Sequence, residues 1–155
     1  MDQIDRNILQ ELQSDATISI AKLADRVGLS QTPCWKRVQK LEAAAVITGR
    51  IAVVDPRKVG LGLTVLMDVE AMDHTADWRA RFLAVVDTMP EVMEVLRLGG
   101  VADYHLRIIV ADTDAFDLIY RRLTEAVACK SVTSKFVMER MRIRTVLPIP
   151  TVVGR

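Results

Sequence analysis

Apolar residues recur at helical spacing near the start of the chain. They predict a helix over residues 2–15, with Asp2 capping its first turn. A second helix is predicted over residues 18–28, from a capping Ser19 to a stop at Gly28. The positions that carry these predictions are Ile4, Ile8, Leu9 and Leu12 in the first helix and Ile20, Leu23, Ala24 and Val27 in the second.

A third helix is predicted to begin at a capping Ser30. Pro33 then occupies the third helical position, where a backbone amide has no acceptor within the helix and its loss costs little. Behind the proline, apolar residues spaced i, i+4 and i+7 form one narrow buried stripe. The stripe consists of Cys34, Val38 and Leu41, and the residues largely outside it are Gln31, Thr32, Lys36, Arg37, Gln39 and Lys40.

Two short helices joined by a tight glycine turn, the second with a polar and basic face, predict a helix-turn-helix domain over residues 1–49. Short apolar runs predict strand segments at 46–47 and 50–55. The Pro- and Gly-containing stretch "DPRKVGLG" marks a boundary. We therefore expect a linker strand or hinge within residues 50–60 and a second domain over residues 61–155.

The second domain alternates apolar and polar residues with a period of two, and two helical stretches interrupt the alternation. The order strand, helix, strand, strand, helix, strand is the ferredoxin-like arrangement of an α+β protein. Apolar residues recur on both faces of the predicted sheet, and the two helices cover only one face. We therefore expect a homodimer in which two sheets stack. The predicted strands cover residues 63–70, 92–98, 104–110 and 132–142, and the predicted helices cover 75–89 and 112–127.

Composition narrows the class of protein. The chain has 155 residues, half of them hydrophobic, and a formal net charge of +1. No apolar run reaches the roughly 18 residues that a membrane helix needs, and the opening "MDQIDRNILQ" lacks the apolar segment of a secretory signal. We therefore expect a cytoplasmic protein. Cys34 and Cys129 lie far apart in the sequence, which predicts neither a disulfide framework nor a zinc site.

Positive charge is concentrated in one part of the chain. Residues 30–58 contain six basic and two acidic side chains, whereas residues 61–155 contain 12 basic and 13 acidic ones. Such a local concentration suits a phosphate backbone. The alternative interpretation is a solvated helix face, which is what most charge runs are.

The stretch "LSQTPCWKRVQKLEAAAVI", followed by "DPRKVGLG", resembles the leucine-responsive/asparagine-regulator (Lrp/AsnC) family of feast-or-famine transcription factors. The resemblance continues through "PEVMEV", "DYHLRIIV" and "VTSKFVMERM" and so spans nearly the whole chain. It implies a winged-helix-like DNA-binding domain, a ferredoxin-like amino-acid-sensing (RAM/ACT-like) domain, and dimers that assemble into larger rings, often octamers. It also implies a small amino acid bound between dimers. "TPCWKR", "VGLGLT" and "MPEV" resemble the branch that controls cysteine breakdown.

The third predicted helix carries the candidate DNA contacts. Side chains near the start of a recognition helix meet base edges, and lysines and arginines further along meet phosphates or guanine. Trp35 either lies against a sugar–phosphate edge or a thymine methyl group, or covers the helix pair. Cys34 is expected to be a small core residue. The candidate DNA-binding residues are Ser30, Gln31, Thr32, Pro33, Trp35, Lys36, Arg37, Gln39 and Lys40.

The loop "LGGVADYH" carries the candidate effector site, because consecutive glycines let backbone amides approach a ligand. Asp103 would accept the α-ammonium group, and loop amides with a Thr or Ser hydroxyl would bind the carboxylate. The resemblance implies that a Thr/Ser pair on the last strand faces this loop from a neighbouring dimer. The alternative is a β-turn with a capping aspartate. The candidate effector-binding residues are Gly99, Gly100, Val101, Ala102, Asp103, Thr133 and Ser134.

The family pattern "G-[DE]-[YF]-D-[YFL]" has an acid and an aromatic residue where this chain has Val101 and Ala102. Small apolar side chains favour a compact ligand such as cysteine, alanine or serine.

Three functions compete at this point. The first is a sequence-specific transcription regulator that responds to an amino acid, with no other cofactor. The second is an architectural DNA-wrapping protein with a degenerate effector site. The third is a small ferredoxin-like enzyme or a free-standing amino-acid-binding module. The basic helix-turn-helix pattern argues against the third, as does the isolation of His74 and His105, which have neither a nucleophile nor metal-ligand spacing beside them.

Overall fold

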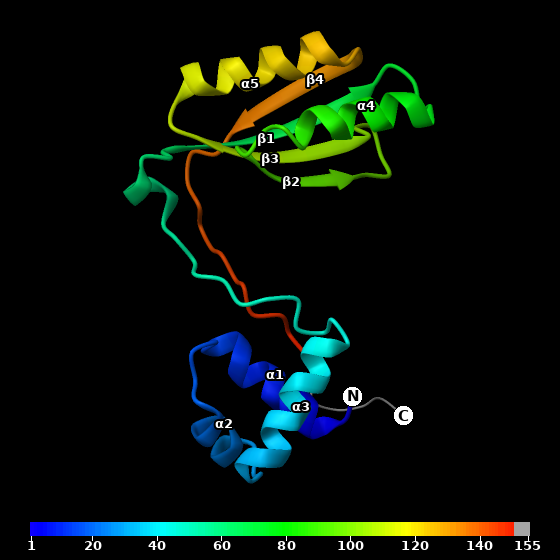
Figure 1. Ribbon diagram of the computed structural model, residues 1–155. Helices are drawn as coiled ribbons and strands as arrows, with labels where there is room; N and C mark the ends of the chain where they lie inside the picture. Colours follow the sequence, from blue (N-terminus) through cyan, green and yellow to red (C-terminus); the bar gives the residue numbers. More distant parts are fainter. Residues whose placement is uncertain (151–155) are drawn as a thin grey trace. The chain divides into compact units, whose positions relative to one another are not determined.

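The computed structural model describes residues 1–150, which form two compact units (Figure 1). The helical unit contains Met1–Val53 together with residues 141–150, and the sheet unit contains Val54–Arg140. The helical unit therefore uses both ends of the described chain. Residues 141–150 were predicted to belong to the second domain, and the structure groups them with the first.

Three helices form the helical unit, each beginning where the sequence predicts. Asp2 and Asp5 form a capping box at the start of the first helix, and the Ser19 hydroxyl accepts the amide of Lys22 at the start of the second. Ser30 occupies the N-cap of the third helix, but its side chain makes no capping hydrogen bond. Gly28 has a φ of 70°, the left-handed conformation that ends the second helix. The helices are α1 (Gln3–Ser14), α2 (Ile20–Arg26) and α3 (Gln31–Ala43).

The core of the helical unit is small. Its members come from all three helices, at the positions that the helical spacing predicts. The chain segment after residue 140 adds Ile149, which packs against this core. Gln13 and Arg6 on α1 bond to the same segment, through Leu147 and the carbonyl of Pro150. The buried core residues are Ile8, Leu9, Leu23, Ala24, Cys34, Val38 and Leu41.

The predicted linker strand is absent. Residues 50–55 have no regular secondary structure, residues 46–47 lie in a bend, and a short 3-10 helix, η1 (Pro56–Val59), follows. Ile51 and Val53 are 86% and 80% exposed. A run of β-forming residues becomes a strand only when a neighbour satisfies its backbone hydrogen bonds, and the described chain supplies none here.

The sheet unit has the predicted order β-α-β-β-α-β, which confirms the ferredoxin-like arrangement. The strands lie in the order β2-β3-β1-β4, and each neighbouring pair is antiparallel. The fourth strand ends at Phe136, whereas the sequence predicts its end near residue 142. The elements are β1 (Leu63–Ala71), α4 (Ala76–Val86), β2 (Val92–Arg97), β3 (Tyr104–Val110), α5 (Thr113–Ala126) and β4 (Cys129–Phe136).

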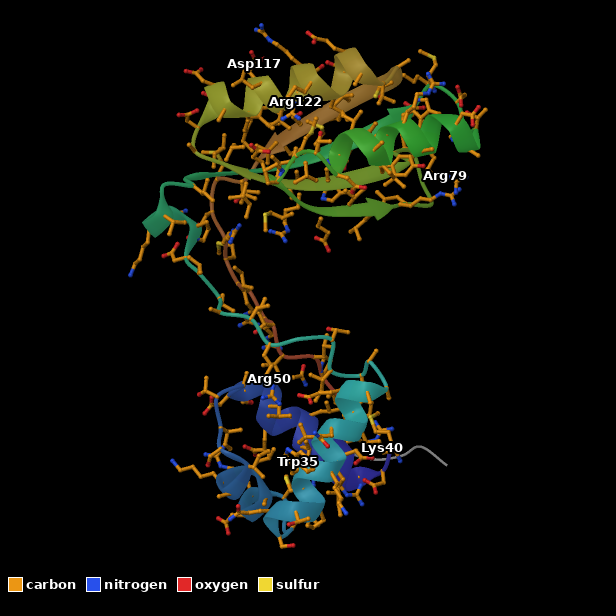
Figure 2. The ribbon with its side chains drawn as sticks, in the orientation of Figure 1. Trp35, Lys40, Arg50, Arg79, Asp117 and Arg122 are labelled. Carbon is orange, nitrogen blue, oxygen red and sulfur yellow. The ribbon has the colours of Figure 1, made fainter. Side chains whose placement is uncertain are left out.

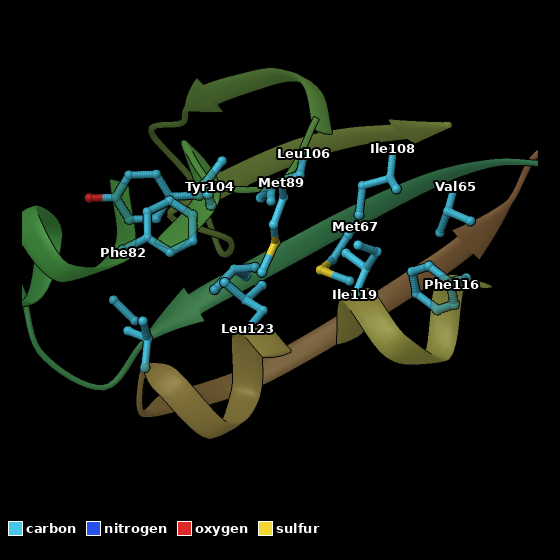
Figure 3. Packing of buried hydrophobic residues seen from close by; sticks show 14 of the residues in the cluster. Val65, Met67, Phe82, Met89, Tyr104, Leu106, Ile108, Phe116, Ile119 and Leu123 are labelled. Atoms are coloured by element: carbon cyan, nitrogen blue, oxygen red, sulfur yellow. The ribbon is translucent and has the colours of Figure 1, made fainter. Parts of the chain in front are cut away.

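Both helices of this unit pack on one face of the sheet (Figure 1). Alternate residues of β1 are buried under them, as the period of two predicts. Trp78 and Phe82 of α4 stack at a centroid distance of 5.1 Å, and Phe82 lies 4.7 Å from Tyr104 of β3. Figure 3 shows Phe82 and Tyr104 together at one end of the core.

The second helix, α5, covers the same face of the sheet through Phe116, Ile119 and Leu123. Phe116 lies at the end of the core away from Tyr104 (Figure 3). There its ring meets Phe136 of β4 edge to face, with centroids 5.5 Å apart. Aromatic contacts therefore anchor both ends of the layer between the helices and the sheet.

The opposite face of the sheet has no helix over it within the sheet unit. It combines apolar side chains with charged ones that pair across strands, such as Asp68 with His105, whose Oδ1 and Nδ1 atoms are 2.6 Å apart. The apolar residues on this open face are Leu66, Leu96 and Ile109. The face is thus less uniformly apolar than the sequence suggests, and the stacked homodimer stays a prediction.

Candidate DNA-binding and effector sites

The outer surface of α3 collects most of the predicted DNA contacts. Trp35 and Lys40 both project from this helix (Figure 2). Trp35 is 47% exposed, so it only partly covers the helix pair. Lys36 and Gln39 are exposed between them, whereas Cys34 is fully buried. The other exposed candidates are Ser30, Gln31, Thr32 and Pro33.

Ion pairing separates the basic residues of the helical unit into two groups. Arg26 pairs with Glu11 at 2.6 Å, and Arg50, which follows α3, pairs with Glu42 at 3.0 Å. Within the described part of the chain, Lys22, Lys36 and Lys40 form no ion pair. Their charge is available to an external anion such as a DNA phosphate.

Lys22 on α2 is a candidate that the sequence analysis missed. It lies in the first turn of α2 and is exposed. The first helix of a helix-turn-helix crosses the DNA backbone, so a lysine there suits a phosphate contact. Its position on the first helix of the predicted motif was the signal that could have identified it.

Arg37 differs from the other basic residues of α3. Its Nη1 atom donates to Asp2 Oδ2 and to Asp5 Oδ1, each at 2.7 Å. The hydrogen bonds to Asp5 and Asp2 raise the pKa of the guanidinium further above its ordinary value. The structure therefore ties this predicted DNA contact to α1.

The glycine-rich loop joins β2 to β3 in the sheet unit. Asp103 at its end is fixed on three sides: its amide donates to the Val69 carbonyl, its carbonyl accepts the Leu98 amide, and its Oδ2 accepts the Ala71 amide at 2.8 Å. Its other carboxylate oxygen lies 3.6 Å from His74 Nδ1. The side chain thus bonds to β1, 32 residues away in the sequence, and not to an amide of its own loop as the β-turn interpretation would require. Its second oxygen is directed towards an exposed histidine.

A hollow of about 180 Å³ lies beside this loop, on the open face of the sheet. This volume is smaller than the roughly 300–1,000 Å³ of pockets for drug-sized ligands, and it suits a ligand no larger than one amino acid. The predicted residues Gly99, Gly100 and Asp103 do not line it. Its lining consists of Val101, Ala102 and Thr133, which were predicted, and Asp68, Glu70 and Ser131, which were not.

Sequence reasoning missed Asp68 and Glu70 because it followed only the apolar side of β1. Alternation of that strand places its even-numbered residues on the face opposite the core, which is the signal that could have found them. Both carboxyl groups are ionised more readily than usual. Lys135 and then His105 lower the pKa of Asp68, and Lys130 and then Ser131 lower the pKa of Glu70.

The side chains of the predicted Thr133–Ser134 pair lie on opposite faces of the sheet. Thr133 is opposite Asp68 in the sheet register and shares the open face, whereas Ser134 is opposite the buried Met67. The Ser134 hydroxyl is buried on the face that the helices cover, without a hydrogen-bond partner among the described residues. Adjacent strand residues point to opposite faces, so only Thr133 reaches the hollow.

Neither cysteine has the environment of a reactive thiol. Burial raises the pKa of Cys34 and of Cys129. Among residues 1–150, no group of three or more His, Cys, Asp or Glu side chains is arranged to hold a metal ion. The same residues include no helix that is long and apolar enough to cross a membrane.

Comparison with known proteins covers both units of the chain. Residues 1–42 match the AsnC-type helix-turn-helix domain, and residues 64–147 match the Lrp/AsnC ligand binding domain. The chain belongs to the Lrp/AsnC family of transcriptional regulators. It is 43% identical over 150 residues to the DNA-binding transcriptional activator DecR of Escherichia coli strain K12, an alignment that covers 96% of this chain and 99% of DecR.

Two solved structures of the family have the same fold. An AsnC family transcriptional regulator from Agrobacterium tumefaciens has a TM-score of 0.90 and 44% identity, covering 96% of this chain and 97% of that one. A transcriptional regulator from Neisseria meningitidis in complex with L-Met has a TM-score of 0.89 and 32% identity, covering 96% of each chain. The relatives are DNA-binding regulators rather than enzymes, which removes the enzyme hypothesis.

Membership of the Lrp/AsnC family settles the general function. The chain is a DNA-binding transcriptional regulator with an amino-acid-binding domain. The architectural alternative with a degenerate effector site is not favoured, because the match to the ligand-binding domain, residues 64–147, includes every residue that lines the hollow.

Proposed function

We propose that α3 is the recognition helix and that its exposed face reads operator DNA. One observation carries this proposal: Lys36 and Lys40, unpaired within the described residues, share an exposed face with Thr32 and Gln39. A lysine can bind a phosphate, and a glutamine can bond to the edge of adenine in the major groove. Lys22 on α2 adds a phosphate contact beside them.

The DNA proposal is tested by the dependence of affinity on salt. A protein that loses one phosphate contact has a salt slope smaller by about 1. We expect this change in Lys36→Ala and in Lys40→Ala, measured by fluorescence anisotropy on an operator selected from random duplexes. Lys130→Ala, in the sheet unit, is the matched control and should leave the slope unchanged. Unchanged slopes in both α3 variants would remove this helix from the interface.

Gln39→Ala tests base readout separately from charge. Loss of a good base contact costs about 1–3 kcal/mol of discrimination. We expect this variant to lose preference for the selected operator over a scrambled duplex, with the same salt slope as the unchanged chain. An unaltered preference would assign base readout to other residues of α3.

We further propose that the hollow beside the glycine-rich loop binds a small amino acid. Thr133 offers a hydroxyl to the ligand carboxylate, and Glu70 lines the hollow as a carboxylate that suits an ammonium group. Asp103, the acceptor that the sequence predicts, lies outside this lining and also bonds to Ala71. Val101 and Ala102 are small, which favours a compact side chain such as that of cysteine, alanine or serine. The L-Met complex of the Neisseria relative makes methionine a further candidate.

Calorimetry across the common amino acids tests the effector proposal. Thr133→Ala and Glu70→Gln, at two lining residues, should weaken the binding that the unchanged chain shows, and Asp103→Asn tests the acceptor that the sequence predicts. Ser134→Ala is the matched control, because its hydroxyl is buried on the opposite face of the sheet. Equal weakening in Ser134→Ala, or no heat with any amino acid, would contradict this site.

The open face of the sheet supports a proposed homodimer, with octamers as the larger assembly. Leu66 and Leu96 lie on that face with part of their surface exposed, and a second sheet stacked on it would bury them, whereas Ile109 is already buried. Sedimentation should then show no folded species of 17.3 kDa at micromolar concentration. A monomer would contradict the dimer, and a dimer that never grows would contradict the octamer. The proposed location is the cytoplasm, as expected for a regulator that binds DNA.

A further inference from the structure

Arg37 lies on α3 but forms its ion pairs within the protein. One guanidinium nitrogen bonds to both Asp2 and Asp5, each at 2.7 Å, and the arginine side chain is 33% exposed. Asp5 is only 8% exposed and is the buried charged residue of the described chain. A buried carboxylate that loses its partner is costly, so Arg37 cannot leave Asp5 freely.

The two aspartates also hold the start of α1. The amide of Asp5 donates to Asp2 Oδ1 at 2.9 Å, and the amide of Asp2 donates to Asp5 Oδ2 at 3.0 Å. Together with the two bonds from Arg37, these contacts connect the first turn of α1 to the middle of α3. Carboxylates are favourable at a helix N-terminus, so Asp2 and Asp5 stabilise the start of α1 as well as pairing with Arg37.

The connection borders the proposed DNA-binding surface. Lys36, Arg37 and Lys40 line one shallow depression together with Asp2 and Asp5. Without the arginine, the two carboxylates would stand unneutralised beside the lysines and would repel a phosphate. The same substitution would also release α3 from α1.

We infer that Arg37 is a positioning residue: it fixes α3 against α1 through Asp2 and Asp5 and does not itself contact DNA. This inference rests on the proposal that α3 is the recognition helix. It replaces the direct DNA contact that the sequence predicts for Arg37, and it leaves Lys36 and Lys40 as the phosphate-binding residues of the helix.

The two roles predict opposite effects of Asp5→Asn. If Arg37 positions α3, this variant weakens DNA binding, because the buried anchor of the arginine loses its charge. If Arg37 contacts DNA directly, the same variant frees the arginine and leaves the affinity equal or higher. Arg37→Gln weakens binding in both cases. It also reduces the salt slope only if Arg37 contacts a DNA phosphate directly, because that contact is then lost.

The experiment measures affinity against salt by anisotropy for Asp5→Asn and Arg37→Gln on the selected operator. Circular dichroism sets a temperature at which each variant is fully folded, so that a loss of affinity does not reflect unfolding. We expect both variants to bind roughly 5–30-fold more weakly with an unchanged salt slope. Lys40→Ala, with its slope reduced by about 1, is the control for a direct contact.

Two results would overturn the positioning role. One is a reduced slope in Arg37→Gln with undiminished affinity in Asp5→Asn, which would make Arg37 a DNA contact. The other is full affinity in both folded variants, which would make the network a source of stability alone. If Asp5→Asn does not fold, Asp2→Asn provides the same comparison at a more exposed partner of Arg37. Unchanged slopes in Lys36→Ala and Lys40→Ala would instead refute the proposed DNA surface.

Discussion

The helical unit and the sheet unit are stabilised in different ways. Seven buried residues form the core of the helical unit, whereas 16 form the core of the sheet unit. The small core is supplemented by polar links between segments, such as those from Arg37 to α1 and from Gln13 to Leu147. A small domain buries too little apolar surface to tolerate many losses, so each link matters more there.

The difference has a consequence for the two sites. Helices of 7 to 13 residues have little stability in isolation, so the orientation of α3 depends on its contacts with the rest of the helical unit. The hollow in the sheet unit instead lies on strands whose backbones are bonded to one another along their length. We therefore expect DNA binding to be more sensitive than effector binding to changes away from the contact residues.

The largest predicted effects come from the two cores. Phe82→Ala should cost about 3–5 kcal/mol in the sheet unit and Ile8→Ala about 2–5 kcal/mol in the helical unit, because each side chain is fully buried. Hydrogen exchange measured peptide by peptide checks both. Ile8→Ala should reduce protection in α1 and α3 and leave β3 protected, and Phe82→Ala should do the reverse. Simultaneous loss in both units would show that they unfold together.

A smaller effect is expected from the segment that follows the sheet unit. Ile149→Ser should destabilise the helical unit by about 1.5 kcal/mol, because it removes a partly buried apolar side chain that packs against the core of seven residues. Urea denaturation, monitored by amide hydrogen exchange in α1, measures the loss of stability. Ile143→Ser changes an exposed residue of the same segment and is the control. Equal stability of the two variants would show that the segment adds nothing to the core.

Removing a helix cap should destabilise the helical unit still less, and the two N-cap serines should differ in how much they contribute. Ser19→Ala should cost about 1 kcal/mol, because its hydroxyl accepts the Lys22 amide at the start of α2. Ser30→Ala should cost less, because the Ser30 side chain makes no capping bond. Thermal unfolding of the two variants makes the comparison. A larger loss in Ser30→Ala would indicate that its hydroxyl caps α3 in solution.

Lowering the pH should produce the smallest loss of stability, because the titrating carboxylates are partly exposed. Pairing with Lys135 and His105 lowers the folded pKa of Asp68, so its contribution to stability is present above the unfolded value of 3.8 and is lost as pH falls through the lower folded value. Glu70, with an unfolded pKa of 4.5, behaves in the same way. Asp68→Asn should therefore make the acid-induced loss of stability in the sheet unit shallower. An unchanged pH profile would contradict this assignment.

Local pattern was enough for most of the elements. The spacing of Ile8, Leu23 and Val38 predicts three helices, and the alternation around Val65 and Leu106 predicts strands, because each residue's face is decided by the period of its own element. The position of Pro33 in the first turn of α3 was likewise predictable, since the orphan amides of a first turn are a local property.

The sites were predicted only in part, because they depend on partners far away in sequence. The exposed lysines of α3 follow from its narrow apolar stripe, but nothing local to Arg37 shows that Asp2 and Asp5 will lie beside it. The sequence likewise joined Thr133 to Ser134 as neighbours, whereas the register of β4 against β1 separates them to opposite faces.

The sequence by itself therefore determined most of the secondary structure, the ferredoxin-like order, the family and the basic character of α3, all of which are encoded in short-range patterns. Only the tertiary structure decided that residues 50–55 have no strand partner within the described chain, and that residues 141–150 complete the helical unit. It also decided which carboxylates surround the hollow and that Arg37 is held by α1. The physical reason is that hydrogen-bond and ion-pair partners are chosen by proximity in space, which residue spacing along a chain does not specify.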